Sequence, residues 1–108
     1  MDYSNVKIVL IDDDELVRMT WKFAAKKATI QVLTFAQPDE FINLSSQFSS
    51  EVKIYIDENL SHGMRGSEVS KRIYELGFQN IFLATGYEPD FVQGIPWIKG
   101  IVGKEPPF

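Results

Sequence analysis

Short apolar runs alternate along this chain with longer segments in which apolar residues recur every three or four positions. The runs Val6–Ile11, Val52–Ile56 and Ile81–Thr85 are nearly continuously apolar, which is typical of strands buried on both faces of a sheet. Thr29–Phe35 and Ile101–Lys104 are expected to be two further short strands. Alternating strands and helices predict an α/β fold, in which parallel strands are joined by right-handed crossovers and helices cover both faces.

The first expected helix, Asp14–Lys27, begins with acids and ends with lysines, as the helix dipole favours. It is amphipathic, and we expect Trp21 to be partly exposed because it lies on the side opposite Phe23. The apolar stripe at helical spacing consists of Leu16, Met19, Thr20, Phe23 and Ala24.

Two more helices are expected between the remaining strands. One opens at Pro38 and carries Phe41, Leu44 and Phe48 on one stripe, and the other covers Ser67–Leu76 and ends at a glycine. Glycine and proline are frequent after position 86, which leaves room only for a short helix near Pro89–Gln93. No helix is expected after the last strand.

Length and composition fit one globular domain over residues 1–108. Apolar residues make up 44% of the chain, charged residues 24%, and the net charge is −4. That charge gives no support to nucleic-acid binding. The chain has no cysteine and no apolar run long enough to span a bilayer, so we expect a cytoplasmic protein without membrane partners.

Polar residues follow four of the expected strands directly. Asp12 and Asp13 follow the first, Asp57 the third, Thr85 ends the fourth and Lys104 ends the fifth. Parallel strands gather their carboxyl ends at one edge of a sheet, so these side chains should share a cleft. Carboxylates suit Mg²⁺, and an aspartate beside a cation can attack phosphorus to form an acyl phosphate. The set predicts capture of a phosphoryl group.

These residues occur within segments that resemble the receiver domains of two-component response regulators, over almost the full chain. The matching pieces are Lys7 to Asp14, Ile56-Asp57, Leu83-Ala84-Thr85-Gly86, and Gly103-Lys104 followed by Pro106 and Phe108. The resemblance implies a doubly wound, flavodoxin-like parallel sheet of five strands in the order 2-1-3-4-5.

The resemblance also implies specific roles. Asp57 would accept a phosphoryl group from a histidine kinase or phosphotransfer domain. Asp12, Asp13, Asp57 and the backbone carbonyl of Asn59 would hold Mg²⁺. Thr85 and Lys104 would bind the phosphoryl group and act as the switch. Such a domain catalyses only its own phosphorylation and hydrolysis, so we expect no enzyme activity on a separate substrate.

The chain departs from the receiver pattern in ways that affect output. The position three residues before Lys104, usually aromatic in the family, is Ile101, and the family's fifth helix is absent. The missing helix would uncover an apolar sheet face, for which we expect a homodimer or a neighbouring domain as cover. Tyr87, two residues after Thr85, is expected to restrict the access of water to the phosphoryl group.

Two alternatives remain open at the level of sequence. A receiver-like docking module could keep the fold without a phosphorylation output, as Ile101 and the missing helix suggest. A phosphatase of the haloacid-dehalogenase type would instead use Asp12 as nucleophile and Asp14 as general acid. Asp14 alone also fits the role of an ordinary helix cap.

Overall fold

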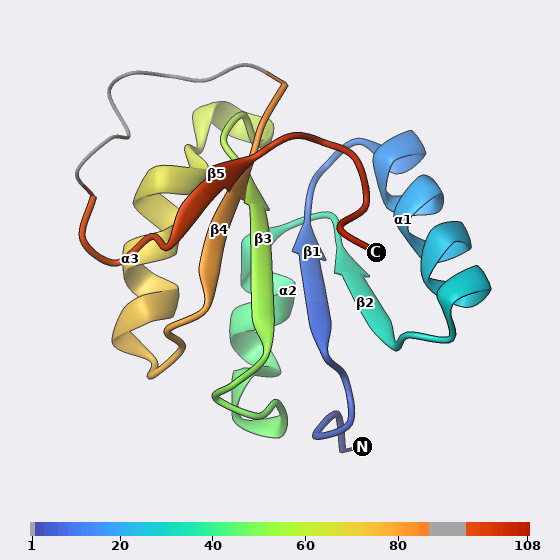
Figure 1. The fold of residues 1–108 in the computed structure, drawn as a ribbon. Coiled ribbons are helices and arrows are strands. Elements are labelled where there is room, and N and C mark those ends of the chain that lie inside the picture. Colours follow the sequence, from blue (N-terminus) through green and yellow to red (C-terminus); the bar gives the residue numbers. More distant parts are fainter. Residues whose placement is uncertain (1, 87–94) are drawn as a thin grey trace.

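A computed structural model describes residues 2–86 and 95–108, which form a parallel five-stranded sheet flanked by helices (Figure 1). The strand order is β2-β1-β3-β4-β5, so the expected doubly wound topology is confirmed. The strands are β1 (Ile8–Ile11), β2 (Val32–Phe35), β3 (Lys53–Asp57), β4 (Ile81–Ala84) and β5 (Gly100–Val102). The α-helices are α1 (Glu15–Ala28), α2 (Pro38–Asn43) and α3 (Gly66–Glu75), and Ser45–Gln47 and Ser61–Gly63 are short 3-10 turns.

The element boundaries differ from the expected ones by a few residues at most. The helix expected from Pro38 is shorter than its apolar pattern, because a 3-10 turn replaces its continuation before Phe48. The helix expected near Pro89–Gln93 and the residue Tyr87 lie outside the described residues. Within the described part of the chain, residues 103–108 form no helix after β5, as expected.

Helix α1 has well-defined ends. The Asp14 side chain accepts a hydrogen bond from the Leu16 backbone N–H at 2.9 Å, which satisfies one of the free donors at the helix start. The helix stops at Thr29, whose backbone is left-handed with φ 57°. Asp14 follows Asp12 and Asp13, which come directly after β1. This cap therefore fixes the start of α1 at the carboxyl edge of the sheet.

The side of α1 that faces the sheet is not the expected one. Trp21 is completely buried and Ala25 nearly so, whereas Leu16, Met19 and Phe23 are 71%, 57% and 64% exposed. The indole stacks edge-on against Tyr55 of β3, with ring centroids 5.2 Å apart. The expectation of a partly exposed Trp21 was therefore wrong: the helix has two apolar sides, and the larger aromatic side chain is buried.

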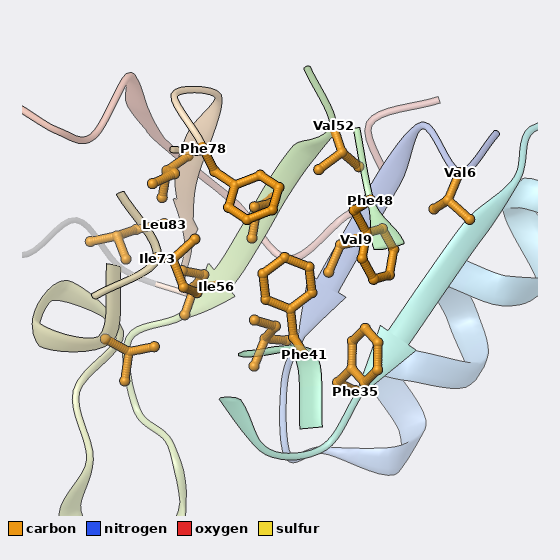
Figure 2. Packing of buried hydrophobic residues seen from close by; sticks show 14 of the residues in the cluster. Val6, Val9, Phe35, Phe41, Phe48, Val52, Ile56, Ile73, Phe78 and Leu83 are labelled. Carbon is orange, nitrogen blue, oxygen red and sulfur yellow. The ribbon is translucent and has the colours of Figure 1, made fainter. Parts of the chain in front are cut away.

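Two apolar clusters hold the layers together. The larger lies between the sheet and helices α2 and α3 (Figure 2), and Phe41 is at its centre, with ring centroids 5.1 Å from Phe48 and 5.3 Å from Phe78. The smaller lies between the sheet and α1 and consists of Ile8, Leu10, Trp21, Tyr55 and Ala84. Phe108 packs against the smaller cluster, so it covers part of the face on which residues 2–86 and 95–108 place no helix besides α1.

Candidate functional site

The carboxyl ends of the strands bring the predicted acidic and basic residues together. The Lys104 Nζ atom lies 2.7 Å from Asp12 Oδ2 and 2.8 Å from Asp57 Oδ1, although the residues come from three different parts of the chain. Asp12 is completely buried and Asp57 is 5% exposed. One ammonium group thus bridges two buried carboxylates at the edge of the sheet.

The backbone and a neighbouring side chain hold Asp12 in place. Its Oδ1 atom accepts a hydrogen bond from the Asp14 N–H at 2.9 Å, and its backbone carbonyl accepts one from Arg18 Nη1, also at 2.9 Å. Both donors belong to the start of α1 or the turn before it. The tight β1–α1 connection therefore orients this carboxylate toward Lys104.

Asp13 completes a cluster of three carboxylates. Oxygen atoms of Asp12, Asp13 and Asp57 all lie within 4.8 Å of one another, and Asp13 is the most exposed of the three. The Ser61 hydroxyl donates to Asp13 Oδ2 at 2.7 Å and ties this acid to the loop after β3. Hard oxygen donors at this spacing fit a small divalent cation such as Mg²⁺.

Burial and neighbouring charges shift the pKa values of Asp57 and Lys104. Burial raises the pKa of the Asp57 carboxyl, and the Asp12 charge raises it further, against the hydrogen bond from Lys104, which lowers it. For Lys104, burial by itself lowers the pKa, but the hydrogen bonds to Asp12 and Asp57 more than offset this and the pKa is raised. Lys104 therefore remains a cation at neutral pH.

Thr85 carries the one unusual polar atom of the site. Its side chain is buried, and its Oγ1 atom has no hydrogen-bond partner among the described residues. The Thr85 backbone N–H, in contrast, donates to the Val102 carbonyl at 2.9 Å and keeps the end of β4 against β5. A buried hydroxyl without a partner is rare in proteins and is available to a ligand oxygen.

Two other predicted positions, Asn59 and Ile101, have different surroundings. The Asn59 backbone N–H donates to Asp57 Oδ1 at 3.3 Å, which places Asn59 beside the Asp57 carboxylate. Ile101 in β5 packs against the larger cluster and is only partly exposed, so this position contributes to the core. Trp97, just before β5, donates to the Ser70 hydroxyl at 2.7 Å.

Trp21 holds the backbone of Lys104, a role that the sequence alone did not indicate. Its indole Nε1–H donates to the backbone carbonyl of Lys104 at 2.8 Å, and its ring lies edge-on to Phe108. The lysine is thus held by its side chain at the carboxylates and by its backbone at α1. The only sequence signal was an indole at helical spacing on the side of α1 opposite Phe23.

Glu58 and Gly66 were also missed, and both fix the loop after β3. Glu58 is 1% exposed and accepts hydrogen bonds from the backbone and the hydroxyl of Ser67, at 2.8 and 3.2 Å. A Cβ atom at Gly66 would collide with the carbonyl oxygen of Asp57. The start of α3 is therefore packed directly on the residue that ends β3.

Comparisons with known proteins identify the fold. No protein-family model and no curated protein matches the chain. It is similar to the response regulator StyR, with 21% identity, a TM-score of 0.73, and coverage of 97% of this chain and 53% of StyR, about half of that protein. It is also similar to the N-terminal domain of a response regulator/sensory box/GGDEF protein from Carboxydothermus hydrogenoformans, at 22% identity, a TM-score of 0.75, and 91% and 81% coverage.

A third similar structure is the chemotaxis response regulator CheY4 of Vibrio cholerae, at 22% identity, a TM-score of 0.74, and 97% and 89% coverage. Together with the strand order, these similarities show that the chain has the fold of response-regulator receiver domains. None of the helices in the described part of the chain is long and apolar enough to cross a membrane.

Proposed function

We propose that this chain is a phosphoacceptor receiver domain that takes a phosphoryl group onto Asp57. The observation that carries this proposal is the ammonium group of Lys104 between the buried carboxylates of Asp12 and Asp57. The unpartnered hydroxyl of Thr85, directly after β4, supports it. Such a site holds a nucleophile and a cation within hydrogen-bond distance of each other.

In this proposal an Asp57 carboxylate oxygen attacks the phosphorus of a phosphohistidine on a histidine kinase or phosphotransfer domain. The new O–P bond forms as the P–N bond breaks, and the imidazole leaves with the electron pair of that bond. Asp12, Asp13, Asp57 and the Asn59 carbonyl would hold Mg²⁺, which supplies positive charge to the phosphoryl oxygens when bound. Oxygen atoms of the three carboxylates lie within 4.8 Å of one another, which supports this assignment.

Lys104 and Thr85 would respond to the new group. Once Asp57 carries a phosphoryl group, its oxygens offer Lys104 a denser negative charge than the Asp57 carboxylate alone. The Thr85 hydroxyl would donate to another of these oxygens and gain the partner that it lacks. Since Thr85 is bonded through its backbone to β5, its movement would shift the β4–β5 edge and change the population of two conformations.

Water access to the phosphoryl group, cellular location and binding partners complete the proposed function. We propose that Tyr87 limits hydrolysis by restricting water, that the domain works in the cytoplasm, and that it turns over no separate substrate. A homodimer or neighbouring domain over the face without a fifth helix would contact Val102, which is 36% exposed, and the half-buried Phe82. Phe108 already covers part of this face, so the area left for such a partner is smaller than expected.

Intact-mass analysis after treatment with acetyl phosphate and Mg²⁺ tests the proposal. The wild-type chain should gain the mass of one phosphoryl group, and Asp57→Asn should gain none. Asp14→Asn is the matched control, because asparagine caps helices as well as aspartate does. Phosphorylation of the Asp57→Asn variant at the wild-type rate would overturn the assignment of the acceptor.

The same experiment separates the alternatives. A haloacid-dehalogenase-type phosphatase would be labelled at Asp12 and would lose activity in Asp14→Asn. The Asp14 carboxylate accepts from the Leu16 N–H at the start of α1, so a capping role explains this residue without catalysis. A docking module without output would bind its partner equally well with and without the phosphoryl group.

A further inference from the structure

The outer side of α1 exposes three large apolar side chains in a row. Leu16, Met19 and Phe23 are 71%, 57% and 64% exposed, and their spacing of three and four positions places them on one side of the helix. The other exposed large apolar residues of the described chain, Tyr74, Leu76 and Val102, are spread over α3, the residue after it, and β5. We call Leu16, Met19 and Phe23 the α1 stripe.

The packing of α1 onto the sheet does not account for this stripe. Trp21 and Ala25 fill the inner side of the helix, so the stripe points away from the sheet. Its only cover in the described residues is partial: the Lys27 ammonium lies 5.0 Å from the centroid of the Phe23 ring. Contiguous exposed apolar side chains with a charged border are typical of protein interaction sites.

The charges at the two ends of the stripe are opposite. Asp14 and Glu15 lie at its start, and Lys26 and Lys27 lie at its end. The helix dipole favours this arrangement in any helix, so the charges alone indicate no partner. Together with a central apolar stripe, however, they make the surface complementary to itself when a second helix runs in the opposite direction.

We propose that the α1 stripe binds the α1 stripe of a second copy of this chain, with the two helices antiparallel across a two-fold axis near Met19. This pairing sets Leu16 against the Phe23 of the second copy, and it brings the acidic end of each helix to the basic end of the other. Thr20 and Ala24 flank the stripe and are small enough to let the helices approach closely. A two-fold axis makes each of these contacts occur twice.

The size of the surface predicts a weak dimer. Helix α1 has 14 residues and is therefore about 21 Å long, and one such helix pair buries less than a standard stable interface. The association should depend on protein concentration and weaken as salt screens the charges at the helix ends. It requires neither Mg²⁺ nor phosphorylation, so it is independent of the proposed function.

Sedimentation velocity of the full chain between about 10 µM and about 1 mM tests this proposal. The wild-type protein should shift from monomer to dimer over this range, and Met19→Glu should weaken the association at least tenfold. Leu76→Glu is the matched control, because it makes the same kind of change at a residue with 49% exposure outside the stripe. Circular dichroism checks that both variants are folded.

Charge exchange tests the antiparallel orientation. Glu15→Lys and Lys27→Glu should each weaken self-association, because each places like charges opposite one another twice. An equimolar mixture of these two variants, and the double variant, should regain the wild-type association. A chain that stays monomeric throughout the range, or a dimer unaffected by Met19→Glu, overturns the proposal and leaves the stripe to a different macromolecule.

Discussion

The two faces of the sheet are built differently, and the difference shows where the fold and the site depend on each other. The face under α2 and α3 has a large cluster in which the ring of Phe41 contacts those of Phe35, Phe48 and Phe78 (Figure 2). The face under α1 has a smaller cluster, completed by Trp21 and Phe108. In the second cluster, the Trp21 indole donates a hydrogen bond to the Lys104 backbone carbonyl at the site. The larger cluster therefore mainly supplies stability, whereas the smaller one also orients the lysine.

The largest effect is expected in the larger cluster. Phe41→Ala should lower the free energy of unfolding by about 3–5 kcal/mol, since it removes a completely buried ring between two others. Phe23→Ala makes the same change at an exposed position and should stay within about 0.5 kcal/mol. Urea unfolding measures both. Equal losses in the two variants would contradict the packing described for α1.

The next effect tests the coupling on the α1 face. Trp21→Phe should cost about 2 kcal/mol, because it leaves a half-buried carbonyl without a donor and a small cavity beside Tyr55. It should also slow phosphorylation by acetyl phosphate about tenfold, because Lys104 loses its backbone anchor. Ile8→Val, in the same cluster but not at the site, should lower stability and leave the phosphorylation rate unchanged. If Trp21→Phe and Ile8→Val were phosphorylated at the same rate, packing of the smaller cluster would not influence the site.

A smaller effect of opposite sign is expected at Thr85. Thr85→Val removes a buried hydroxyl without a partner, so the unphosphorylated protein should gain up to about 1 kcal/mol. The same change should weaken binding of beryllofluoride with Mg²⁺, because the donor to the phosphoryl-like group is lost. Thr85→Ser keeps the hydroxyl and should retain most of the binding. A loss of stability in Thr85→Val would mean that the hydroxyl has a partner.

The smallest effect concerns pH. Because burial raises the pKa of Asp57, the folded state holds this proton more firmly than the unfolded state. The resulting stability is fully present below the unfolded pKa of about 3.8 and is lost as pH rises through the folded pKa. Without Mg²⁺, Asp57→Asn should therefore gain stability relative to wild type as pH rises from 4 to 7. Urea unfolding of both proteins at a series of pH values measures this difference.

Much of this architecture could be predicted from short-range patterns. Continuous apolar runs such as those ending at Ile11 and Ile56 identify buried parallel strands, and parallel strands necessarily place the residues that follow them at one edge. The proximity of Asp12, Asp57 and Lys104 follows from that topology, and the structure bears it out.

The side of α1 that is buried could not be predicted from periodicity. The helix offers both the Leu16 and Trp21 sides as apolar surfaces, and the choice depends on the space left over the sheet. Glu58 was missed for a related reason, since a buried acid is recognisable only from the Ser67 donors that the start of α3 brings to it. Both cases depend on contacts between elements that no local sequence pattern records.

The position of Trp21 gives the protein a built-in optical probe. Its indole is shielded from water and bonded to the main chain of Lys104, so a displacement of that segment changes the polarity that the ring senses. Its fluorescence can be followed in the unlabelled protein as a ligand is added. Trp97→Phe removes the fluorescence of the second tryptophan, which lies near Ser70.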